Sequence, residues 1–409
     1  MKILSLNAGS RSVKGCLYDV AKSGDLALEA PAPLWRYSLG WSTLPGMAIA
    51  ASAASAHERS IFIESPVDAS RVVLADFSAS GEHVDVVAHR VVRSRSEQQA
   101  DAIIDEKQIA AIAAAIDLAP DHNPFVLAAI AGIAEKFPAI TQIAVSDSAF
   151  HNDLPEAAAV YALPLDWHDL YGIQRVGFHG LSHAYSSQRV GQMWGCAAPD
   201  LRIVSCHLGG GASLAAVRGG RSVDTTMGFT PLEGLVMETR SGSIDPGIIL
   251  YLLQHTSYSL TTLDRALRHD SGLRGISGRS GDMREILIAR GSDPRARLAF
   301  DVYVHRLSAQ IAAMAVSLGG LDALVFTGGV GANSCDVRAA ACQRLAFLGS
   351  ALDSERNALM DGKDGEISAK NAKMRAFVVQ TREEWEMARA ARVLVARGSN
   401  IAFKGTSVW

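Results

Sequence analysis

The chain has 409 residues, of which 48% are hydrophobic, and a formal net charge of −3 at neutral pH. This length exceeds that of one ordinary domain and predicts two domains, with three as an alternative. The near-neutral charge gives no broad positive field of the kind that binds nucleic acid or an anionic membrane surface. We therefore expect its partners to be small molecules or further copies of the chain.

Five cysteines are scattered along the sequence without metal-ligand spacing, at positions 16, 196, 206, 335 and 342. Such a pattern is typical of reduced thiols in a cytoplasmic protein. The first apolar run is too short for a signal peptide, and no later run is long enough to span a bilayer. The sequence therefore predicts a cytoplasmic protein without a membrane partner.

The first twenty residues predict a strand, a polar loop and a second strand. Residues 3–6 are apolar, residues 7–12 read Asn-Ala-Gly-Ser-Arg-Ser, and apolar character returns over residues 13–20. Residues 31–70 carry little information. Within them, the Ala- and Ser-rich residues 48–56 are expected to form either a helix or a loose surface segment.

A buried strand is predicted over residues 84–92, where His89 and Arg90 interrupt an apolar run. Burying a basic group is costly unless it has a partner, so Arg90 is expected to face an anion at the end of the strand. An ordinary structural ion pair is the alternative.

Two Ala-rich helices are predicted over residues 103–117 and 125–137, and residues 143–145 form the next strand. Asp147 follows that strand. The carboxyl ends of strands bind ligands in open α/β sheets, so Asp147 is a candidate metal or substrate contact, with a helix N-cap as the alternative.

A glycine-rich hairpin is predicted where an apolar run enters Gly209-Gly210-Gly211 and a second apolar run leaves it. Glycines lack Cβ, so backbone N–H groups can close around an anion. Residues 3–20 show the same order of apolar entry, polar residue, glycine loop and apolar exit. The sequence therefore predicts an internal duplication, with a polyphosphate held from both sides in a cleft between two domains. Arg240 lies in a Gly- and Ser-flanked loop and could form a bidentate pair of hydrogen bonds with a phosphate or carboxylate.

The last third of the chain predicts a flexible loop over residues 271–281, a long helix over residues 300–318 and a strand over residues 321–326. That strand runs into Gly328-Gly329-Val330-Gly331, a pattern that lets a nucleotide lie against backbone at a helix start. A final strand over residues 374–379 precedes a helix that begins with Glu383 and Glu384, whose carboxylates also favour the helix dipole.

In this order the motifs resemble the acetokinase family of the sugar-kinase/actin superfamily of ATP-dependent phosphotransferases. The matching motifs are Asn-Ala-Gly-Ser-x-Ser-x-Lys at 7–14, His-Arg-Val-Val at 89–92, His-Asn-Pro at 122–124, Asp-x-Ala-Phe-His at 147–151, Gly-Phe-His-Gly-x-Ser-His at 177–183, His-Leu-Gly-x-Gly-Ala-Ser at 207–213, Asp-Thr-x-Met-Gly-x-Thr-Pro-Leu-Glu-Gly at 224–234, Thr-Arg-Ser-Gly at 239–242, Phe-Thr-Gly-Gly-x-Gly at 326–331 and Glu-Glu at 383–384.

The resemblance implies an α/β fold of two duplicated actin-like, ribonuclease H-like domains, each with a βββαβαβα core, and an active-site cleft between them. The first domain would comprise residues 1–148 and 383–409, and the nucleotide-binding domain residues 149–382. The implied reaction is reversible transfer of the γ-phosphoryl group of ATP to a short-chain carboxylate, which gives ADP and an acyl phosphate. Mg²⁺ is the implied metal, with Mn²⁺ as an alternative, and the implied assembly is a homodimer.

The same resemblance assigns the site residues. The catalytic positions are Asn7, Arg90, His122, Asp147, His179 and Arg240, and the metal positions are Asn7 and Glu383. The substrate-binding positions are Arg90, Val92, Phe178 and Pro231, and the nucleotide-binding positions are Lys14, His207, Gly209, Gly211, Asp282, Met283, Arg284, Gly329 and Gly331. Because the nucleophile is already a carboxylate, positioning and charge stabilisation carry the catalysis and no strong base is needed.

Several residues depart from the family pattern, namely Arg11, Gly210, Glu238, Ser243, Ala332 and Arg382. In addition, Asp121 stands beside the acyl pocket where the family has an apolar residue. Three other functions compete with an acetate-specific kinase: a kinase that prefers propionate or butyrate, a pyrophosphate-using relative, and a non-catalytic nucleotide-binding regulator. The glycines at 328–331 and the Asp-Met-Arg at 282–284 disfavour pyrophosphate, and the retained catalytic positions disfavour a regulator.

Overall fold

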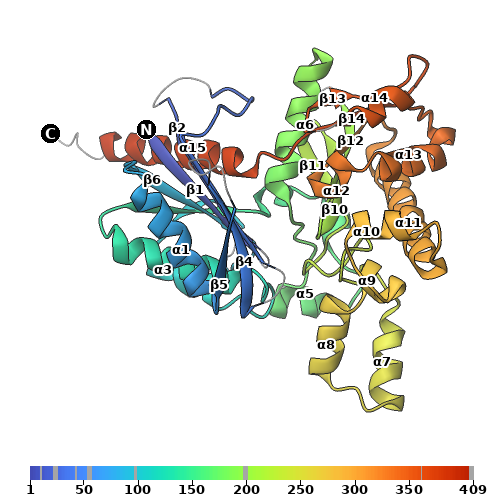
Figure 1. Ribbon diagram of the computed structural model, residues 1–409, viewed down its shortest axis with the longest axis horizontal. Coiled ribbons are helices and arrows are strands. Elements are labelled where there is room, and N and C mark those ends of the chain that lie inside the picture. Colours follow the sequence, from blue (N-terminus) through green and yellow to red (C-terminus); the bar gives the residue numbers. More distant parts are fainter. Residues whose placement is uncertain are drawn as a thin grey trace. The chain divides into compact units, whose positions relative to one another are not determined.

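The computed structural model describes residues 1–9, 12–21, 26–41, 44–52, 58–95, 99–196, 201–360 and 362–404, except for the side chains of residues 398–404. The chain divides into two compact units (Figure 1). Unit 1 comprises Met1–Ala149 and Arg382–Trp409, and unit 2 comprises Phe150–Thr381. Among the described residues, no helix has both the length and the apolar character that crossing a membrane requires.

Unit 1 is built on an eight-stranded sheet with the order β5-β4-β3-β2-β1-β6-β8-β7. Its strands are β1 (Lys2–Ala8), β2 (Ser12–Asp19), β3 (Trp35–Trp41), β4 (Gly46–Ser52), β5 (Arg59–Ile63), β6 (Val86–Val91), β7 (Ala102–Ile103) and β8 (Thr141–Ser146). The first three strands pair antiparallel, whereas β6 and β8 continue the sheet parallel to β1.

Unit 2 repeats this topology in a six-stranded sheet with the order β11-β10-β9-β12-β14-β13. Its strands are β9 (Arg202–Leu208), β10 (Ala212–Arg218), β11 (Arg221–Thr225), β12 (Ala323–Thr327), β13 (Gly365–Glu366) and β14 (Arg375–Val378). Again, a central strand has two antiparallel neighbours in succession on one side and two parallel strands on the other. The predicted α/β class and internal duplication are therefore confirmed.

Helices cover both sheets. In unit 1, α1 (Pro66–Ala79) and α3 (Asn123–Lys136) pack on one face and α15 (Glu383–Lys404) on the other (Figure 1). In unit 2, α6 (Gly180–Trp194) packs against β9 and β12, and α11 (Pro294–Leu318) packs against β9, β10 and β11. The remaining helices are α2 (Glu106–Ala113), α4 (Glu156–Ala159), α5 (Leu165–Tyr171), α7 (Pro246–His255), α8 (Leu260–His269), α9 (Gly272–Ser277), α10 (Met283–Ala289), α12 (Gly328–Asn333), α13 (Cys335–Arg344) and α14 (Ser354–Ala358).

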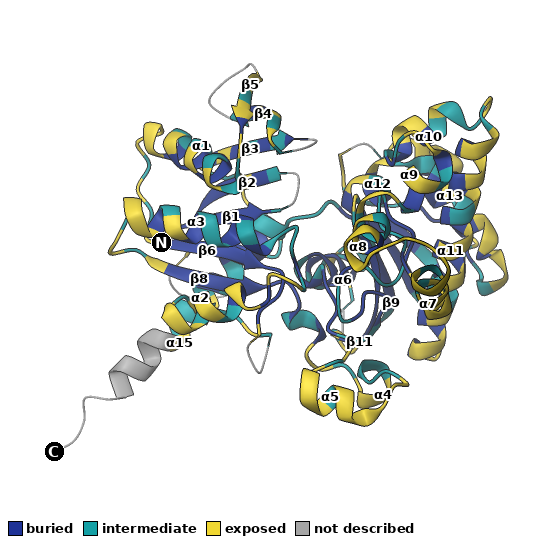
Figure 2. Cartoon of the chain, turned by 90° about the horizontal axis from the view of Figure 1, so that it is seen from below, coloured by how far each residue is buried: buried dark blue, intermediate teal, exposed yellow. Residues whose placement is uncertain are grey.

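The long helix α11 shows how local sequence sets an element. Its N-cap is Asp293, whose side chain accepts hydrogen bonds from the backbone N–H groups of Arg295 and Ala296, and Pro294 occupies the first turn. Gly319 ends the helix in the left-handed conformation, which glycine adopts without a Cβ clash. Its apolar stripe is buried against the strands, which are the most buried part of each unit (Figure 2).

Three segments differ from the prediction. Ile103, the first residue of the helix predicted over residues 103–117, lies in strand β7, and the helix found there is α2. Residues 48–52 belong to β4 and form neither a helix nor a loose segment, while residues 53–56 lie outside the described residues. Along β4, Ala48 and Ala50 are buried while Met47 and Ile49 are exposed, a two-residue period that fits a strand with one covered face. Pairing with β3 and β5 overrides the helical preference of alanine. The predicted loop over residues 271–281 contains the short helix α9.

Candidate active site

Three polar side chains of unit 1 meet where neighbouring parallel strands end. Asn7 is near the end of β1, Arg90 is near the end of β6, and Asp147 follows β8 directly. All three are buried. Because the carboxyl ends of parallel strands lie at one edge of a sheet, residues far apart in the sequence come within hydrogen-bonding distance there.

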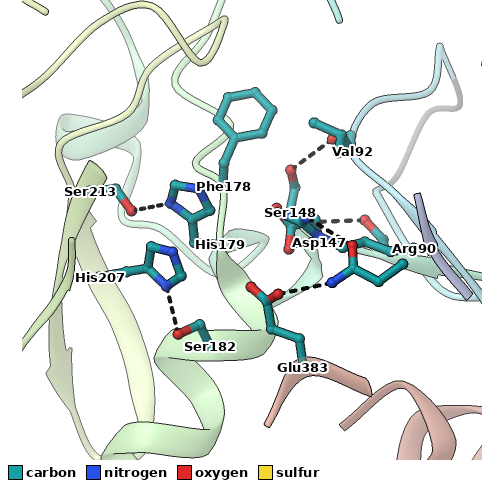
Figure 3. A network of polar contacts seen from close by, with 12 residues as sticks. Arg90, Val92, Asp147, Ser148, Phe178, His179, Ser182, His207, Ser213 and Glu383 are labelled. Carbon is teal, nitrogen blue, oxygen red and sulfur yellow. Dashed lines mark hydrogen bonds and ion pairs between the residues drawn. The ribbon is translucent and has the colours of Figure 1, made fainter. Parts of the chain in front are cut away.

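Arg90 and Asp147 form a two-pronged ion pair (Figure 3). The Nε and Nη2 atoms of Arg90 donate to Oδ1 and Oδ2 of Asp147 at 3.0 and 2.9 Å, and Nη1 donates to Oδ1 of Asn7 at 3.2 Å. Burial works to lower the pKa of Arg90, but the charges of Asp147 and Glu383 raise it above its ordinary value. Arg90 therefore has the structural ion pair that the sequence left as an alternative. A guanidinium has five N–H donors, so two are left to hold an anion.

The amide of Asn7 also reaches the start of α15. Its Nδ2 atom donates to Oε2 of Glu383 at 3.0 Å and to Oε1 of Glu384 at 3.2 Å. Among the described residues, no group of three or more His, Cys, Asp or Glu side chains is arranged to hold a metal ion. Mg²⁺ commonly takes one or two protein carboxylates and completes its shell with water and substrate phosphates. The adjacent carboxylates of Glu383 and Glu384 fit that requirement, whereas both oxygens of Asp147 already accept from Arg90.

The other predicted residues of unit 1 lie around this group. Val92 is buried directly after β6, and His122 is the partly buried N-cap of α3. A Cβ added to Gly9 would lie 4.0 Å from Cδ2 of His122, so the loop after β1 adjoins the start of α3. Lys14 lies opposite Asn7 in the β1–β2 pair, with its side chain exposed.

In unit 2 the predicted glycine hairpin connects β9 and β10. The backbone N–H of Gly209 donates to the carbonyl of Gly211 at 2.9 Å, which closes the turn. A Cβ added to Gly211 would lie 3.4 Å from Nε2 of His179 and 3.5 Å from Nη1 of Arg240. Arg240 Nη1 also donates to the carbonyl of Pro231 at 3.0 Å. Backbone, imidazole and guanidinium thus converge on one point, an arrangement suited to an anion.

His179 has an unusual backbone conformation. Its φ is 57°, and among the described residues it is the only non-glycine residue with positive φ. It is the N-cap of α6, and its ring stacks on His207 with centroids 4.1 Å apart. Ser213 and Ser182 hydrogen-bond to Nδ1 of His179 and of His207 at 2.9 and 2.8 Å, respectively (Figure 3). A strained residue held by several contacts is typical of a functional site.

A cavity of about 540 Å³ lies beside the glycine hairpin in unit 2. It brings together five predicted nucleotide-binding residues, namely Gly209, Asp282, Met283, Arg284 and Gly329. The other lining residues are Gly210, Glu238, Leu273, Gly281, Leu287, Tyr303, Val330, Asn333, Ser334, Cys335 and Asp336. His207, Gly211 and Gly331 are in the same unit but do not line the cavity. Its mixture of apolar and polar walls suits a flat base joined to a polar tail.

Local sequence shapes two walls of the cavity. Asp282 is the N-cap of α10 and accepts from the backbone N–H of Arg284 at 2.8 Å. The Arg284 side chain also pairs with it, and these hydrogen bonds lower the pKa of Asp282. Gly328 turns β12 into α12 with φ of 78°, and a Cβ there would lie 2.5 Å from the carbonyl oxygen of Leu208. Only glycine fits at that turn.

Sequence reasoning missed part of this wall. Glu238 was recognised only as a departure from the family pattern, yet it lines the cavity beside Gly210. Leu273, Leu287 and Tyr303 lie on separate elements, and no local motif joins them to the glycine hairpin. Of the other departures, Ala332 is buried in α12, and Arg11 lies outside the described residues.

Comparison with known proteins gives one consistent result. The sequence profile of the acetokinase family matches residues 2–389. An acetate kinase from Nostoc punctiforme is 45% identical over 402 residues, which cover 95% of this chain and 98% of that protein. The crystal structure of acetate kinase from Porphyromonas gingivalis aligns with a TM-score of 0.83 and 34% identity, over 96% of this chain and 99% of that one. A propionate kinase from Francisella tularensis aligns with a TM-score of 0.83 and 33% identity, over 95% and 98% of the two chains. With nearly its whole length matched in sequence and in structure, the chain belongs to the acetokinase family.

Proposed function

We propose that this protein is an ATP-dependent acetate kinase, which converts acetate and ATP reversibly into acetyl phosphate and ADP. The observation that carries the proposal is the convergence at Gly211. The side chains of His179 and Arg240 both approach the glycine loop there, at 3.4 and 3.5 Å from the Cβ position of Gly211, and a cavity of nucleotide size lies beside the loop. Relatives named acetate kinase match this chain over nearly their whole length, which supports the same function.

The nucleotide is assigned to unit 2. Leu273, Met283 and Val330 offer apolar surface to the adenine ring, and Gly209 and Gly211 offer backbone to the phosphates. In this proposal His207 and Gly331 support the phosphate end and the adenosine end from behind the cavity wall. Lys14, on unit 1, supplies a positive charge for the phosphates.

The acid and the metal are assigned to residues of unit 1. The two remaining N–H donors of Arg90 hold the carboxylate of acetate, and Val92 offers apolar surface to its methyl group, as Phe178 and Pro231 do from unit 2. Glu383, a predicted ligand, would hold Mg²⁺ together with the adjacent Glu384, because the side-chain oxygen of Asn7, the other predicted ligand, already accepts from Arg90 at 3.2 Å. When bound there, the ion would offset the negative charge on the phosphates of the nucleotide.

Transfer itself needs little covalent chemistry from the protein. A carboxylate oxygen of acetate attacks the γ-phosphorus, the bond to the bridging oxygen of ADP breaks, and ADP leaves as the anion. No proton has to be removed, because the carboxylate is already ionised. Arg240 and His179 donate hydrogen bonds to the oxygens of the migrating phosphoryl group, with Asn7 and His122 contributing from unit 1.

A hydroxamate assay tests the activity and the substrate preference together. Acetate, propionate and butyrate are each offered with ATP, GTP or pyrophosphate, and the acyl phosphate is trapped as its hydroxamate. We expect product with ATP and the highest kcat/KM with acetate. A higher kcat/KM with propionate would favour a propionate kinase, the activity named for the Francisella tularensis structure. Product with pyrophosphate alone would contradict ATP as the phosphoryl donor.

A homodimer and a cytoplasmic setting, where ATP is supplied, complete the proposal. Helix α7 has no buried residue although it is mostly apolar, and it exposes Ile248, Leu250 and Tyr251 (Figure 2). Helix α5 likewise exposes Leu170 and Tyr171. Exposed apolar surface of this kind is typical of an interface between subunits. Light scattering after gel filtration should give twice the chain mass, and Leu250→Glu with Tyr251→Glu should reduce it to that of the monomer.

A further inference from the structure

A chain of hydrogen bonds leads from His179 into the interior of unit 2. Ser213 Oγ lies 2.9 Å from Nδ1 of His179 and 2.8 Å from Nε2 of His183. Beyond it, Nδ1 of His183 lies 2.9 Å from Oγ of Ser205, which lies 2.8 Å from Oγ of Ser186. We call these five residues the histidine–serine chain. The other four members, Ser213, His183, Ser205 and Ser186, are all buried. The proposed reaction gives these four residues no role.

The number of protons in the chain restricts its arrangement. Burial lowers the pKa of His183 well below its ordinary value, so His183 is neutral and has one N–H. The hydroxyl of Ser213 also has a single proton, although it contacts two ring nitrogens. When Nε2 of His183 donates to Ser213, the Ser213 hydroxyl is left to donate to Nδ1 of His179. A neutral His179 must then carry its own proton on Nε2.

The opposite arrangement has the opposite result. If His183 carries its proton on Nδ1 and donates to Ser205, Ser213 donates to Nε2 of His183 and accepts from Nδ1 of His179. A neutral His179 then has a bare lone pair on Nε2. That nitrogen is the one that faces the phosphate loop, because a Cβ on Gly211 would lie 3.4 Å from it. A lone pair there would repel a phosphoryl oxygen, whereas an N–H would stabilise it.

Arginine and histidine side chains of unit 2 lie around the two histidines. Arg240 approaches the same point of Gly211 as His179 does, and its positive charge opposes a second proton on the ring. His207 stacks on His179, and the rings of His151 and His207 lie 5.8 and 6.4 Å from that of His183. When His179 carries a single proton, the position of that proton decides what the ring offers to the substrate.

We propose that Ser213 and His183 are positioning residues that hold the proton of neutral His179 on Nε2, so that this nitrogen donates to the migrating phosphoryl group. In the arrangement that does this, His183 donates to Ser213 and Ser213 donates to His179. The inference rests on the proposed kinase function for its consequence, but the location of the proton is a property of the folded protein that can be measured without turnover.

The first test reads the proton directly. Protein with ¹⁵N-labelled histidine is examined by NMR at neutral pH with ADP and Mg²⁺, and the His179 signals are assigned by loss in His179→Asn. We expect chemical shifts of a protonated Nε2 and an unprotonated Nδ1 in the parent, and a mixture of tautomers in Ser213→Ala. A parent His179 with its proton on Nδ1 overturns the proposal, whether or not the protein makes acetyl phosphate.

The second test compares turnover across pH in the direction that forms ATP. At pH 8, Ser213→Ala should lose at least about tenfold in kcat, a part of the loss expected for a whole donor, with little change in the KM for ADP. The deficit should shrink as the pH falls, because a doubly protonated His179 presents an N–H at Nε2 without help. A purely structural role for Ser213 predicts the same deficit at every pH, and that result contradicts the proposal.

Three further variants serve as controls. Ser213→Thr keeps the hydroxyl and should recover most of the turnover. Ser205→Ala removes the group that accepts from Nδ1 of His183 in the opposite arrangement, so it should keep near-parental turnover at every pH. A deficit that grows with pH in this variant would contradict the proposal, which keeps the test decisive if Ser213→Ala does not fold. Ser187→Ala removes a buried hydroxyl of α6, the helix that carries His183; this hydroxyl donates to the carbonyl of Ala184 at 3.0 Å, and the variant should behave as the parent. If the parent makes no acetyl phosphate, the proposed function fails and the NMR result still stands.

Discussion

The Oε2 atom of Glu238 lies 2.9 Å from the point at which a side chain on Gly210 would begin. The two residues also share a hydrogen bond, because the backbone N–H of Glu238 donates to the carbonyl of Gly210 at 3.2 Å. The family resemblance implies Asn at 210 and Gly at 238, so both residues depart from the expected pattern. In this chain, the side chain at this place in the cavity wall comes from Glu238. The family resemblance implies that it usually comes from residue 210.

This exchange predicts strong coupling between the two positions. Gly210→Asn alone should raise the KM for ATP, since the new side chain meets the Glu238 carboxylate, and Glu238→Gly in that background should restore it. Residues in contact commonly show coupling of about 0.5–3 kcal/mol, so the double variant should bind ATP about twofold to 150-fold better than additivity predicts. Additive effects on KM in the double-mutant cycle would show that the two side chains do not compete for space.

Arg90 should be essential for turnover. Arg90→Ala removes the guanidinium assigned to the acetate carboxylate and should lower kcat by at least about two orders of magnitude, the scale of one electrostatic stabiliser. The variant also leaves Asp147 buried without its cation, which destabilises the fold. Arg90→Met with Asp147→Leu should recover thermal stability without recovering turnover.

Arg95→Ala is the matched control for Arg90. Arg95 pairs with Asp117 at 2.9 Å, but both side chains are largely exposed, and such pairs contribute little. We expect near-parental kcat and melting temperature in Arg95→Ala. Arg90→Ala turnover equal to that of this control would remove Arg90 from the site.

His89 should make the fold sensitive to mild acid. It is buried against Gln142, with Nε2 of His89 2.8 Å from Oε1 of Gln142, and burial lowers the pKa of His89 to about 4. An unfolded histidine titrates near about pH 6.5, so between these values the unfolded chain binds the extra proton and stability falls as the pH falls. His89 should account for about 2 kcal/mol of unfolding free energy lost between pH 6.5 and pH 5.

Urea unfolding at these two pH values checks the prediction. The difference in unfolding free energy should be smaller by about that amount in His89→Gln than in the parent. His183 titrates in the same sense, so some pH dependence should survive in the variant. An identical difference in both proteins would mean that His89 is not protonated on unfolding.

The parts of the fold that the sequence predicted are those with a local signal. The hairpin at Gly209 to Gly211 and the strand that ends just before Asp147 follow from short apolar runs joined to glycine or polar residues. Residues 48–52 were ambiguous, because alanine favours helices and only pairing with both neighbouring strands makes them a strand.

The candidate site shows the same division. Motifs indicated Arg90 and Asp147, but not that each oxygen of Asp147 accepts from Arg90, a contact that depends on two parallel strands ending together. The contact of Ser213 with His183 joins β10 to α6, and Glu238 reaches Gly210 across a loop. Neither distance follows from spacing in the sequence.

Asp121 is the residue at which substrate preference is best tested. Asp121 is partly buried and directly precedes His122, the N-cap of α3. Arg95, a basic residue that could offset the charge of a nearby carboxylate, pairs with Asp117. A carboxylate close to the acid substrate would repel it by about 1–4 kcal/mol at ~4 Å. If Asp121 faces the substrate, Asp121→Leu should lower the KM for acetate or propionate several-fold and leave that for ATP unchanged. Equal KM values for both acids in variant and parent would show that Asp121 faces away.

Direct phosphoryl transfer between ATP and acetate can be followed by ³¹P NMR of a reaction with equimolar ATP and acetate in the presence of Mg²⁺. We expect acetyl phosphate and ADP to appear in equal amounts, added ADP to reverse the reaction, and Arg240→Ala to form at least about a hundredfold less of both products. Inorganic phosphate in place of acetyl phosphate, or equal product from the parent and Arg240→Ala, would contradict this mechanism.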